Sequence, residues 1–433
     1  MSRHRSHTLV VFICCLSIVS VAFGVRQSFG LFMRPITLDT GWGREALALT
    51  FATQALMIGL FAPIAGALAD RWSPGKTLML GGGLFCAGLL AMAGASQPVV
   101  MFGGGGLLAG AGLSGCGLPL ALAVIGRIAP ADRRSLWLGV ATASATAGQL
   151  ALVPLMQEVI GDRGWRAAVL LAAGLVAITV PLAAVVAKST HAGLGRDADQ
   201  SLGETLRSAR SHSGYLLLTL GFFVCGFQVQ FIAIHLPSYI VDQGLAASLA
   251  ATALVVIAAA NAFGAWLAGW AGGLCRKRYL LSGIYGGRAL LFLVLISIPL
   301  SPPVMLVLSA GIGFLWLGTV PLTSGLVAEM FGPRYMATLY SFVFLSHQIG
   351  SFTGVWLGGR IYDATGSYQP VWWLTIALGV AASFIHLPRS LADSTLTCLR
   401  VLLAPGGLLS LWLIESSMGI RNYTIDEWAG EAQ

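Results

Sequence analysis

Charged residues are scarce in this chain. Only 10% of its 433 residues are Asp, Glu, Lys or Arg, whereas soluble domains carry about 25%. The chain is also 56% hydrophobic. A sequence with this composition cannot cover a water-facing surface, so lipid must surround much of it.

Motifs for catalysis or metal binding are missing from the sequence as well. It has no HExxH motif, no Gly-x-Ser-x-Gly motif, no paired carboxylates within an apolar run, and no metal-ligand spacing among its seven cysteines. We therefore expect no enzyme, no metal and no cofactor. The net charge of +8 comes from short basic clusters between apolar runs, a pattern that does not predict nucleic-acid binding.

What the sequence does have is a series of long apolar runs. Each is close to the roughly 20 residues that a helix needs to cross a bilayer. They predict an all-α membrane protein with twelve transmembrane helices, at residues 9–33, 46–69, 77–96, 99–127, 135–158, 165–187, 214–240, 246–273, 279–299, 302–328, 336–360 and 370–388.

The basic residues predict the orientation. When the N-terminus is placed in the cytoplasm, most of the 25 Lys and Arg residues fall on cytoplasmic segments, as the positive-inside rule requires. We therefore expect a multi-pass protein of the cell membrane with both termini in the cytoplasm.

The chain divides into two similar halves. Gly24 to Pro35 matches Gly226 to Pro237, and Gly110-x-Gly112 matches Gly311-x-Gly313, at a nearly constant offset. Repeated six-helix halves are a transporter architecture with the binding site between them. We expect a first half at 1–187, a cytoplasmic linker at 188–213, a second half at 214–389 and a tail at 390–433, whose role is left open.

Several segments resemble a known family. Residues 66–76, GALADRWSPGK, resemble the loop 2–3 signature of the major facilitator superfamily. The stretch from Phe29 through Trp42 to Pro63, with residues 316–322, 346–350 and 358–363, resembles bacterial members of the monocarboxylate-transporter and oxalate/formate-exchanger branch. The resemblance implies a protein of the bacterial inner membrane with a major-facilitator fold of two pseudo-symmetric halves, which works by alternating access.

The same resemblance suggests a conformational role for the loop after the second apolar run. It implies that Asp70 pairs with a neighbouring helix in one state, supported by Arg71 and Lys76. One feature of the branch is absent, because its carboxylate-binding arginine in the eighth span has no counterpart here. That span carries Asn261 instead.

Two arginines, Arg26 and Arg288, lie inside apolar runs with no Asp or Glu at similar depth. A charge within the bilayer costs about 2.5–3.5 kcal/mol on insertion scales and usually marks function. Two unmatched cations favour an anionic cargo, and the planar guanidinium fits a carboxylate. The alternative is that each guanidinium bonds the carbonyls at a helix end or reaches toward the membrane surface.

Uncharged polar residues within the spans could complete a binding site, because each needs a partner in hydrocarbon. His347 and His235 are candidates for proton coupling, although each could instead be a neutral histidine bonded to a neighbour. The residues that we expect to line the site with the two arginines are Gln27, Gln228, Asn261, His347 and Gln348.

These observations predict a secondary active transporter for a small organic anion, with a monocarboxylate as the first candidate. H⁺ and a counter-anion are the candidates for a coupled ion. The alternative is an efflux transporter for neutral or drug-like compounds. The sequence leaves open the cargo, the direction of flux, the choice between symport, exchange and uniport, and the oligomeric state, for which we expect a monomer.

Overall fold

The structure, a computed structural model, describes residues 2–129, 134–189, 209–331 and 336–387. Throughout these ranges the regular elements are helices, and none is a strand. The expected tail at 390–433 and most of the linker at 188–213 lie outside the described residues.

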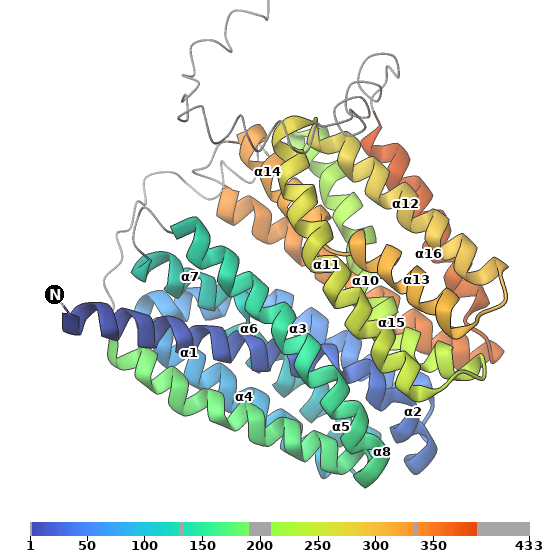
Figure 1. Ribbon diagram of the computed structural model, residues 1–433, viewed down its shortest axis with the longest axis horizontal. Coiled ribbons are helices and arrows are strands. Elements are labelled where there is room, and N and C mark those ends of the chain that lie inside the picture. The colour runs from blue at the N-terminus through green and yellow to red at the C-terminus, as the bar shows by residue number, and fades with distance from the viewer. Residues whose placement is uncertain (1, 130–133, 190–208, 332–335, 388–433) are drawn as a thin grey trace, which may run out of the picture.

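The first half of the chain forms one helical bundle, drawn from blue to green in Figure 1. Its elements are α1 (Ser2–Gln27), α2 (Phe29–Thr40), α3 (Arg44–Arg71), α4 (Pro74–Ala93), α5 (Pro98–Met101), the π-helix η1 (Phe102–Leu108), α6 (Ala109–Cys116), α7 (Leu118–Ile128) and α8 (Arg134–Ser189).

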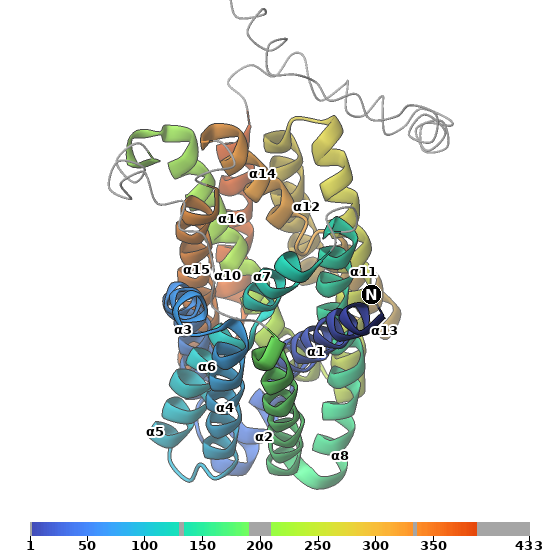
Figure 2. The same cartoon turned by 90° about the vertical axis from the view of Figure 1, so that its left-hand side faces the viewer.

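The second half forms another bundle, drawn from yellow-green to red. Its elements are α10 (Ser213–Asp242), α11 (Ala247–Leu274), α12 (Lys277–Ser297), α13 (Pro302–Phe314), α14 (Thr319–Phe331), α15 (Met336–Thr365) and α16 (Gln369–His386). Figure 2 shows the two bundles one above the other, with α4 and α6 in the lower one and α12 and α16 in the upper one.

Each predicted span coincides with helical residues, and two of them fall on α8, which bends at Gly164 (φ 80°). Among the described residues, nine helical segments are long and apolar enough to cross a membrane, with α8 counted once. The chain is therefore a multi-pass helical membrane protein. The count of twelve crossings stays a prediction.

Three of the predicted spans are interrupted, which the apolar runs did not reveal. The first breaks at Ser28 between α1 and α2, the fourth at Gly117 between α6 and α7, and the tenth at residues 315–318 between α13 and α14. Broken helices leave backbone groups unpaired, and within a membrane such groups occur where they line a cavity or are bonded by other parts of the protein.

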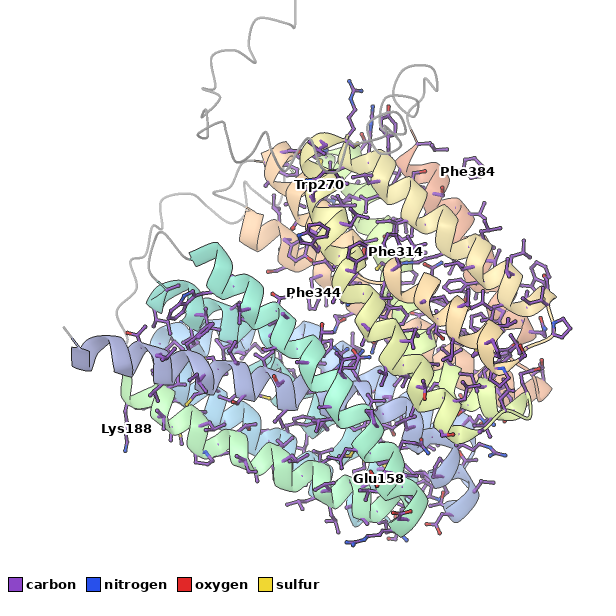
Figure 3. The ribbon with its side chains drawn as sticks, in the orientation of Figure 1. Glu158, Lys188, Trp270, Phe314, Phe344 and Phe384 are labelled. Carbon is purple, nitrogen blue, oxygen red and sulfur yellow. The ribbon has the colours of Figure 1, made fainter. Side chains whose placement is uncertain are left out.

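The outer faces of the bundles are apolar. Phe384 is 67% exposed and Trp266 is 60% exposed, as expected for side chains that face lipid. The charged residues Glu158 and Lys188 lie at opposite ends of the first bundle, as Figure 3 shows. An apolar belt between charged ends is what a bilayer requires.

Glycines bring helices into close contact at equivalent places in the two bundles. A Cβ atom on Gly24 would meet the carbonyl of Gly148, and one on Gly226 would meet the carbonyl of His347. A Cβ atom on Gly350 would likewise meet the backbone of α10 at Phe223. The close pairs α1–α8 and α10–α15 thus repeat between the halves, as the matching sequence segments lead one to expect.

Helices from both bundles meet along a shared interface. The helix α3 packs against α15, α8 against α11, and α2 against α10. The interface therefore brings together the helices that carry most of the predicted site residues.

Candidate functional site

Arg26 lies one residue before the end of α1, next to the break at Ser28. On a helix it shares a face with Cys15, Val19 and Ala22, and all three are buried, whereas the exposed residues near the start of α1 are Leu9, Val10 and Ile13. Arg26 therefore points into the protein and not toward lipid.

The guanidinium of Arg26 is half-buried and unpaired. It forms no hydrogen bond and no ion pair with any described residue. A guanidinium carries five N–H donors and a permanent charge, and in a membrane interior these donors need acceptors. Arg26 is thus a cation whose N–H donors have no acceptor among the described residues.

Next to Arg26, the buried Gln27 begins a chain of amides that crosses the interface. Its Nε2 lies 3.5 Å from Oε1 of Gln149 on α8, and Nε2 of Gln149 donates to the carbonyl of Leu254 on α11 at 3.3 Å. The first half and the second half are therefore joined by polar groups beside the unpaired charge.

Arg288 has the opposite environment. It is only 2% exposed. Its Nε donates to the carbonyl of Leu315 at 2.8 Å, its Nη2 to the carbonyl of Trp316, and one Nη1 to Oε1 of Gln228 at 3.3 Å. Leu315 and Trp316 follow the last residue of α13, so Arg288 bonds the free carbonyls of a helix end. This bonding is the alternative that the sequence left open for this residue.

Asn261 supports the same break from the other side. Its side-chain oxygen accepts a hydrogen bond from the backbone N–H of Leu317 at 3.0 Å. Arg288 and Asn261 together bind three successive residues of the segment between α13 and α14. This segment carries Trp316, whose indole is 4% exposed.

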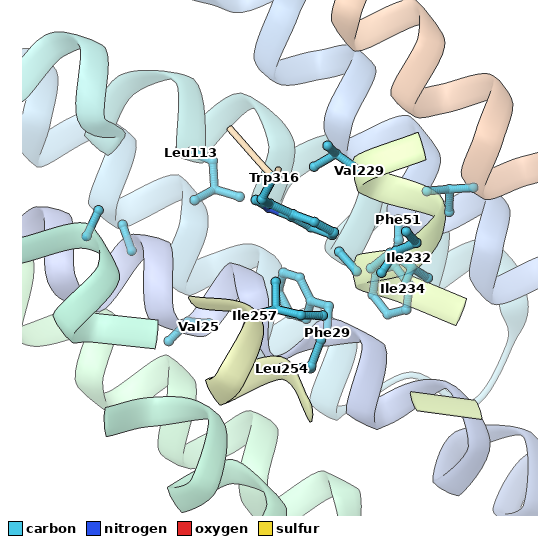
Figure 4. Packing of buried hydrophobic residues seen from close by; sticks show 14 of the residues in the cluster. Val25, Phe29, Phe51, Leu113, Val229, Ile232, Ile234, Leu254, Ile257 and Trp316 are labelled. Atoms are coloured by element: carbon cyan, nitrogen blue, oxygen red, sulfur yellow. The ribbon is translucent and has the colours of Figure 1, made fainter. Parts of the chain in front are cut away.

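Trp316 projects into the middle of the molecule. Figure 4 shows its indole between Leu113 of the first half and residues of the second half, above Phe29 and Ile257. Phe29 stacks on Phe51 at a centroid distance of 5.2 Å. Aromatic and aliphatic side chains therefore pack together at the centre of the interface.

His347 and Gln348 lie on α15, and both are buried. Nδ1 of His347 is 3.0 Å from Oε1 of Gln348, whose Nε2 donates across the interface to the carbonyl of Ala55 on α3 at 2.9 Å. The imidazole also lies between the rings of Phe222 and Phe344. Gln348 therefore joins the two halves directly, which the sequence did not indicate.

Cys225 adds a further partner for Arg288. Its thiol lies 3.5 Å from Nη1 of Arg288 and 3.1 Å from the hydroxyl of Thr319. Gln228, one turn further along α10, also donates to the carbonyl of Thr375 at 3.1 Å. Of the predicted residues of the second half, Gln228 and Arg288 thus belong to one polar cluster with Cys225 and Thr319, whereas His347 and Gln348 contact each other.

A second polar cluster lies at the end of the bundle that carries loop residues 41–43, 243–246 and 366–368. We call it the outer end, because the distribution of basic residues in the sequence predicts that it faces the outside of the cell. Arg44 of α3 forms a bidentate pair with Asp242 of α10, at 2.6 and 2.8 Å. Its guanidinium also lies 3.7 Å from the ring centroid of Tyr362 and donates to the hydroxyl of Tyr368 at 2.9 Å.

Further contacts tie the halves together at the outer end. The carboxylate of Asp363 accepts from the backbone N–H groups of Arg44 and Glu45, at 3.0 and 2.8 Å, and so caps the start of α3. Arg360 pairs with Glu45 at 3.0 Å. Among the ion pairs whose members are both described, those that join the two halves all lie here.

His235 is part of this outer cluster and not of the central one. It is 1% exposed, with Nε2 2.8 Å from the carbonyl of Val355 and Nδ1 3.0 Å from the hydroxyl of Tyr368. The sequence did not identify Arg44, Asp242 and Asp363 as members of one cluster. Their exact pairing could not be read from the chain, because the partners lie hundreds of positions apart.

The predicted conformational lock lies at the opposite end. Arg71 is exposed at the end of α3, and Lys76 is exposed in the first turn of α4. The side chain of Asp70 lies outside the described part of the structure. Its pairing therefore stays a prediction.

The helical bundles and the polar groups at their interface define a class, that of membrane transporters built from two helical halves. Residues 14–355 match the Major Facilitator Superfamily as a family, which is well over half of the chain. The chain belongs to that superfamily.

Curated relatives cover most of the chain at low identity. Human "Monocarboxylate transporter 11" is 28% identical over 413 residues, which cover 88% of this chain and 83% of that protein. The "Oxalate:formate antiporter" of Oxalobacter formigenes is 26% identical and covers 83% of this chain and 85% of its own length. An "Uncharacterized MFS-type transporter YcxA" of Bacillus subtilis is 24% identical over 79% of this chain and 85% of its own.

Solved structures confirm the fold. A bacterial homolog of the human lysosomal transporter Spinster, in an inward-facing and occupied conformation, superposes with a TM-score of 0.69 at 15% identity. The match covers 88% of this chain and 96% of the other. At this identity the likeness concerns the fold alone.

Proposed function

We propose that this transporter moves a small organic anion, with a monocarboxylate as the first candidate, across the cell membrane by alternating access. The observation that carries the proposal is Arg26. Its side chain points into the protein, next to a helix break and the interface of the halves, and it has no partner among the described residues.

The chemistry of Arg26 supports an anionic cargo. An unpaired guanidinium in a low-dielectric interior is costly, and a bound carboxylate would accept two parallel N–H bonds from it. The buried Gln27 beside it could donate a further hydrogen bond. Two of the relatives carry carboxylates in their names, which agrees with this class of cargo.

We assign the other predicted residues to roles around Arg26 and Gln27. Arg288, Asn261 and Gln228 hold the break between α13 and α14 and so position Trp316. Trp316 would then contact the carbon skeleton of the cargo. His347 and Gln348 lie where the halves meet and are placed to respond to their movement.

The outer cluster suggests that the transporter is in a state closed at the outer end. Ion pairs hold the two halves together at the outer end, so a cargo bound at Arg26 would leave toward the inner end. Transport requires a second state in which these pairs separate and the inner end closes, with Asp70, Arg71 and Lys76 supporting that closure.

A counterflow screen tests the proposal. Purified protein would be reconstituted in liposomes loaded with unlabelled lactate, formate, oxalate or a neutral amphiphile, and uptake of the labelled compound would be measured. We expect saturable counterflow of at least one acid and none of the neutral compound. Counterflow of the neutral compound alone would favour the efflux alternative and contradict the proposal.

A further inference from the structure

The hydrogen bonds around His235 have a fixed direction. The carbonyl of Val355 can only accept, so Nε2 of His235 donates to it. The hydroxyl of Tyr368 accepts from Arg44. In a neutral imidazole Nδ1 is then the acceptor, and the Tyr368 hydroxyl donates its hydrogen to it.

This direction connects His235 to the ion pair that joins the halves. Arg44 donates to Tyr368, Tyr368 to His235, and His235 to Val355, while the rest of the Arg44 guanidinium holds Asp242. The relay thus runs from α3 of the first half to α10 and α15 of the second half. While Arg44 and Asp242 are paired at the closed outer end, each donor in this relay has an acceptor.

A second proton on the imidazole does not fit this arrangement. Both ring nitrogens of a charged histidine are donors, so Nδ1–H would meet the hydrogen of the Tyr368 hydroxyl. That hydrogen would have to turn away, on a hydroxyl that already accepts from Arg44. The new positive charge would also face the guanidinium of Arg44 within a buried cluster.

The remaining titratable groups around the relay do not remove this conflict. Asp242 is already engaged on both oxygens by Arg44, and Asp363 caps the start of α3. The other charged or titratable side chains that contact this cluster are Arg34, Glu45, Tyr239, Arg360 and Tyr362.

We propose that His235 is a proton-binding site linked to the outer end, occupied when Arg44 and Asp242 separate and empty when they pair. When the outer end opens, Arg44 leaves Tyr368, whose hydroxyl is then free to accept from Nδ1–H of the charged imidazole. On closure that proton passes to water, and the hydroxyl of Tyr368 donates to Nδ1 again. Because linkage is reciprocal, acid on the outer side favours the open outer end.

The proton site at His235 is independent of the proposed cargo, because it depends only on where the halves separate. The test can therefore be made without any substrate, and a failed search for the cargo would leave it intact.

Distance measurements between spin labels test the link directly. Ser96, in the loop after α4, and Ser297, the last residue of α12, are both exposed at the outer end, so the full-length S96C/S297C protein would be labelled in lipid nanodiscs. We expect the population with the longer distance to rise about threefold or more as the pH falls from about 8 to about 5, the range in which histidine binds protons.

The variant His235→Gln should remove this response. Its amide can donate to Val355 and accept from Tyr368, so it keeps the neutral arrangement but cannot bind the proton. A variant at another buried histidine, His386→Gln, serves as the matched control and should respond as the wild type does.

A second variant keeps the test decisive if His235→Gln does not fold. Tyr368→Phe retains the ring and removes the hydroxyl that joins Arg44 to His235, so its pH response should fall to less than half. The proposal is overturned if the wild type shows no pH-dependent opening, if either variant responds fully, or if His386→Gln abolishes the response.

Discussion

Arg26 and Arg288 are both arginines within apolar spans, one in each half, but their surroundings differ. Arg288 is 2% exposed and bonds two carbonyls and a glutamine, whereas Arg26 has no partner among the described residues. A buried arginine therefore does not indicate an anion site by its depth alone. Only the guanidinium whose donors are free can recruit a carboxylate.

Removal of the free charge should have the largest effect on transport. We expect Arg26→Gln to lower kcat/KM for an acid by at least about 100-fold, because two hydrogen bonds to a charged group are lost at about 1.5–3 kcal/mol each. Arg26→Lys should retain about a tenth of the activity, since an ammonium keeps the charge without the planar fork. Initial counterflow rates measure both effects.

The same variants should leave the fold intact. Since Arg26 bonds no described residue, its replacement should not lower the thermal unfolding midpoint of the purified protein. Unchanged counterflow in Arg26→Gln would exclude Arg26 from the site.

Removal of the bonded charge should instead act on stability. In Arg288→Met the carbonyls of Leu315 and Trp316 lose their donors, and an unsatisfied buried polar group costs about 1–3 kcal/mol. We expect a clear drop in the thermal unfolding midpoint in detergent, and a smaller drop in Arg288→Lys, which keeps one donor group. A midpoint equal to that of the wild type would show that the bonds of Arg288 do not hold the break.

The outer ion pair should control the balance between the two states. Asp242→Asn weakens a bidentate, charge-assisted pair of a kind that contributes about 1–3 kcal/mol. We expect the open outer population to rise about tenfold at neutral pH, measured with the labels at positions 96 and 297.

A matched control for this variant is Asp39→Asn. Asp39 pairs with Arg166 within the first half, and both side chains are about half exposed, so the pair should contribute little. An equal response of the two variants would mean that loss of any outer carboxylate, and not the link between the halves, opens the outer end.

The smallest effect is expected for Asn261→Ala. It removes the acceptor for the N–H of Leu317, a single neutral hydrogen bond that contributes about 1 kcal/mol. The segment of Trp316 should loosen slightly, with a shift in tryptophan fluorescence and a small fall in the unfolding midpoint. A loss as large as that of Arg288→Met would contradict the division of roles between the two residues.

The fold could be predicted from the sequence because membrane helices leave a direct signal, a run of apolar residues of the right length. The superfamily was also predicted, and the matched residues 14–355 confirm it. The repeat of Gly24 and Gly226 correctly predicted equivalent parts of the two halves, whose close helix pairs now correspond.

The partners of the buried polar groups could not be predicted. Arg288 and Trp316, or Arg44 and Asp242, are brought together only by the packing of separate helices, and no spacing along the chain encodes those contacts. The break between α13 and α14 was missed for a related reason. Its residues are as apolar as a helix, and side chains from α11 and α12 satisfy its backbone groups.

Equilibrium binding of a labelled acid to the purified protein tests the central claim most directly. The acid would be the one that the counterflow screen identifies, and the wild type would be compared with Arg26→Gln and Arg288→Lys. We predict saturable binding to the wild type and to Arg288→Lys, and loss of binding in Arg26→Gln. Full binding in Arg26→Gln with loss in Arg288→Lys would contradict the account.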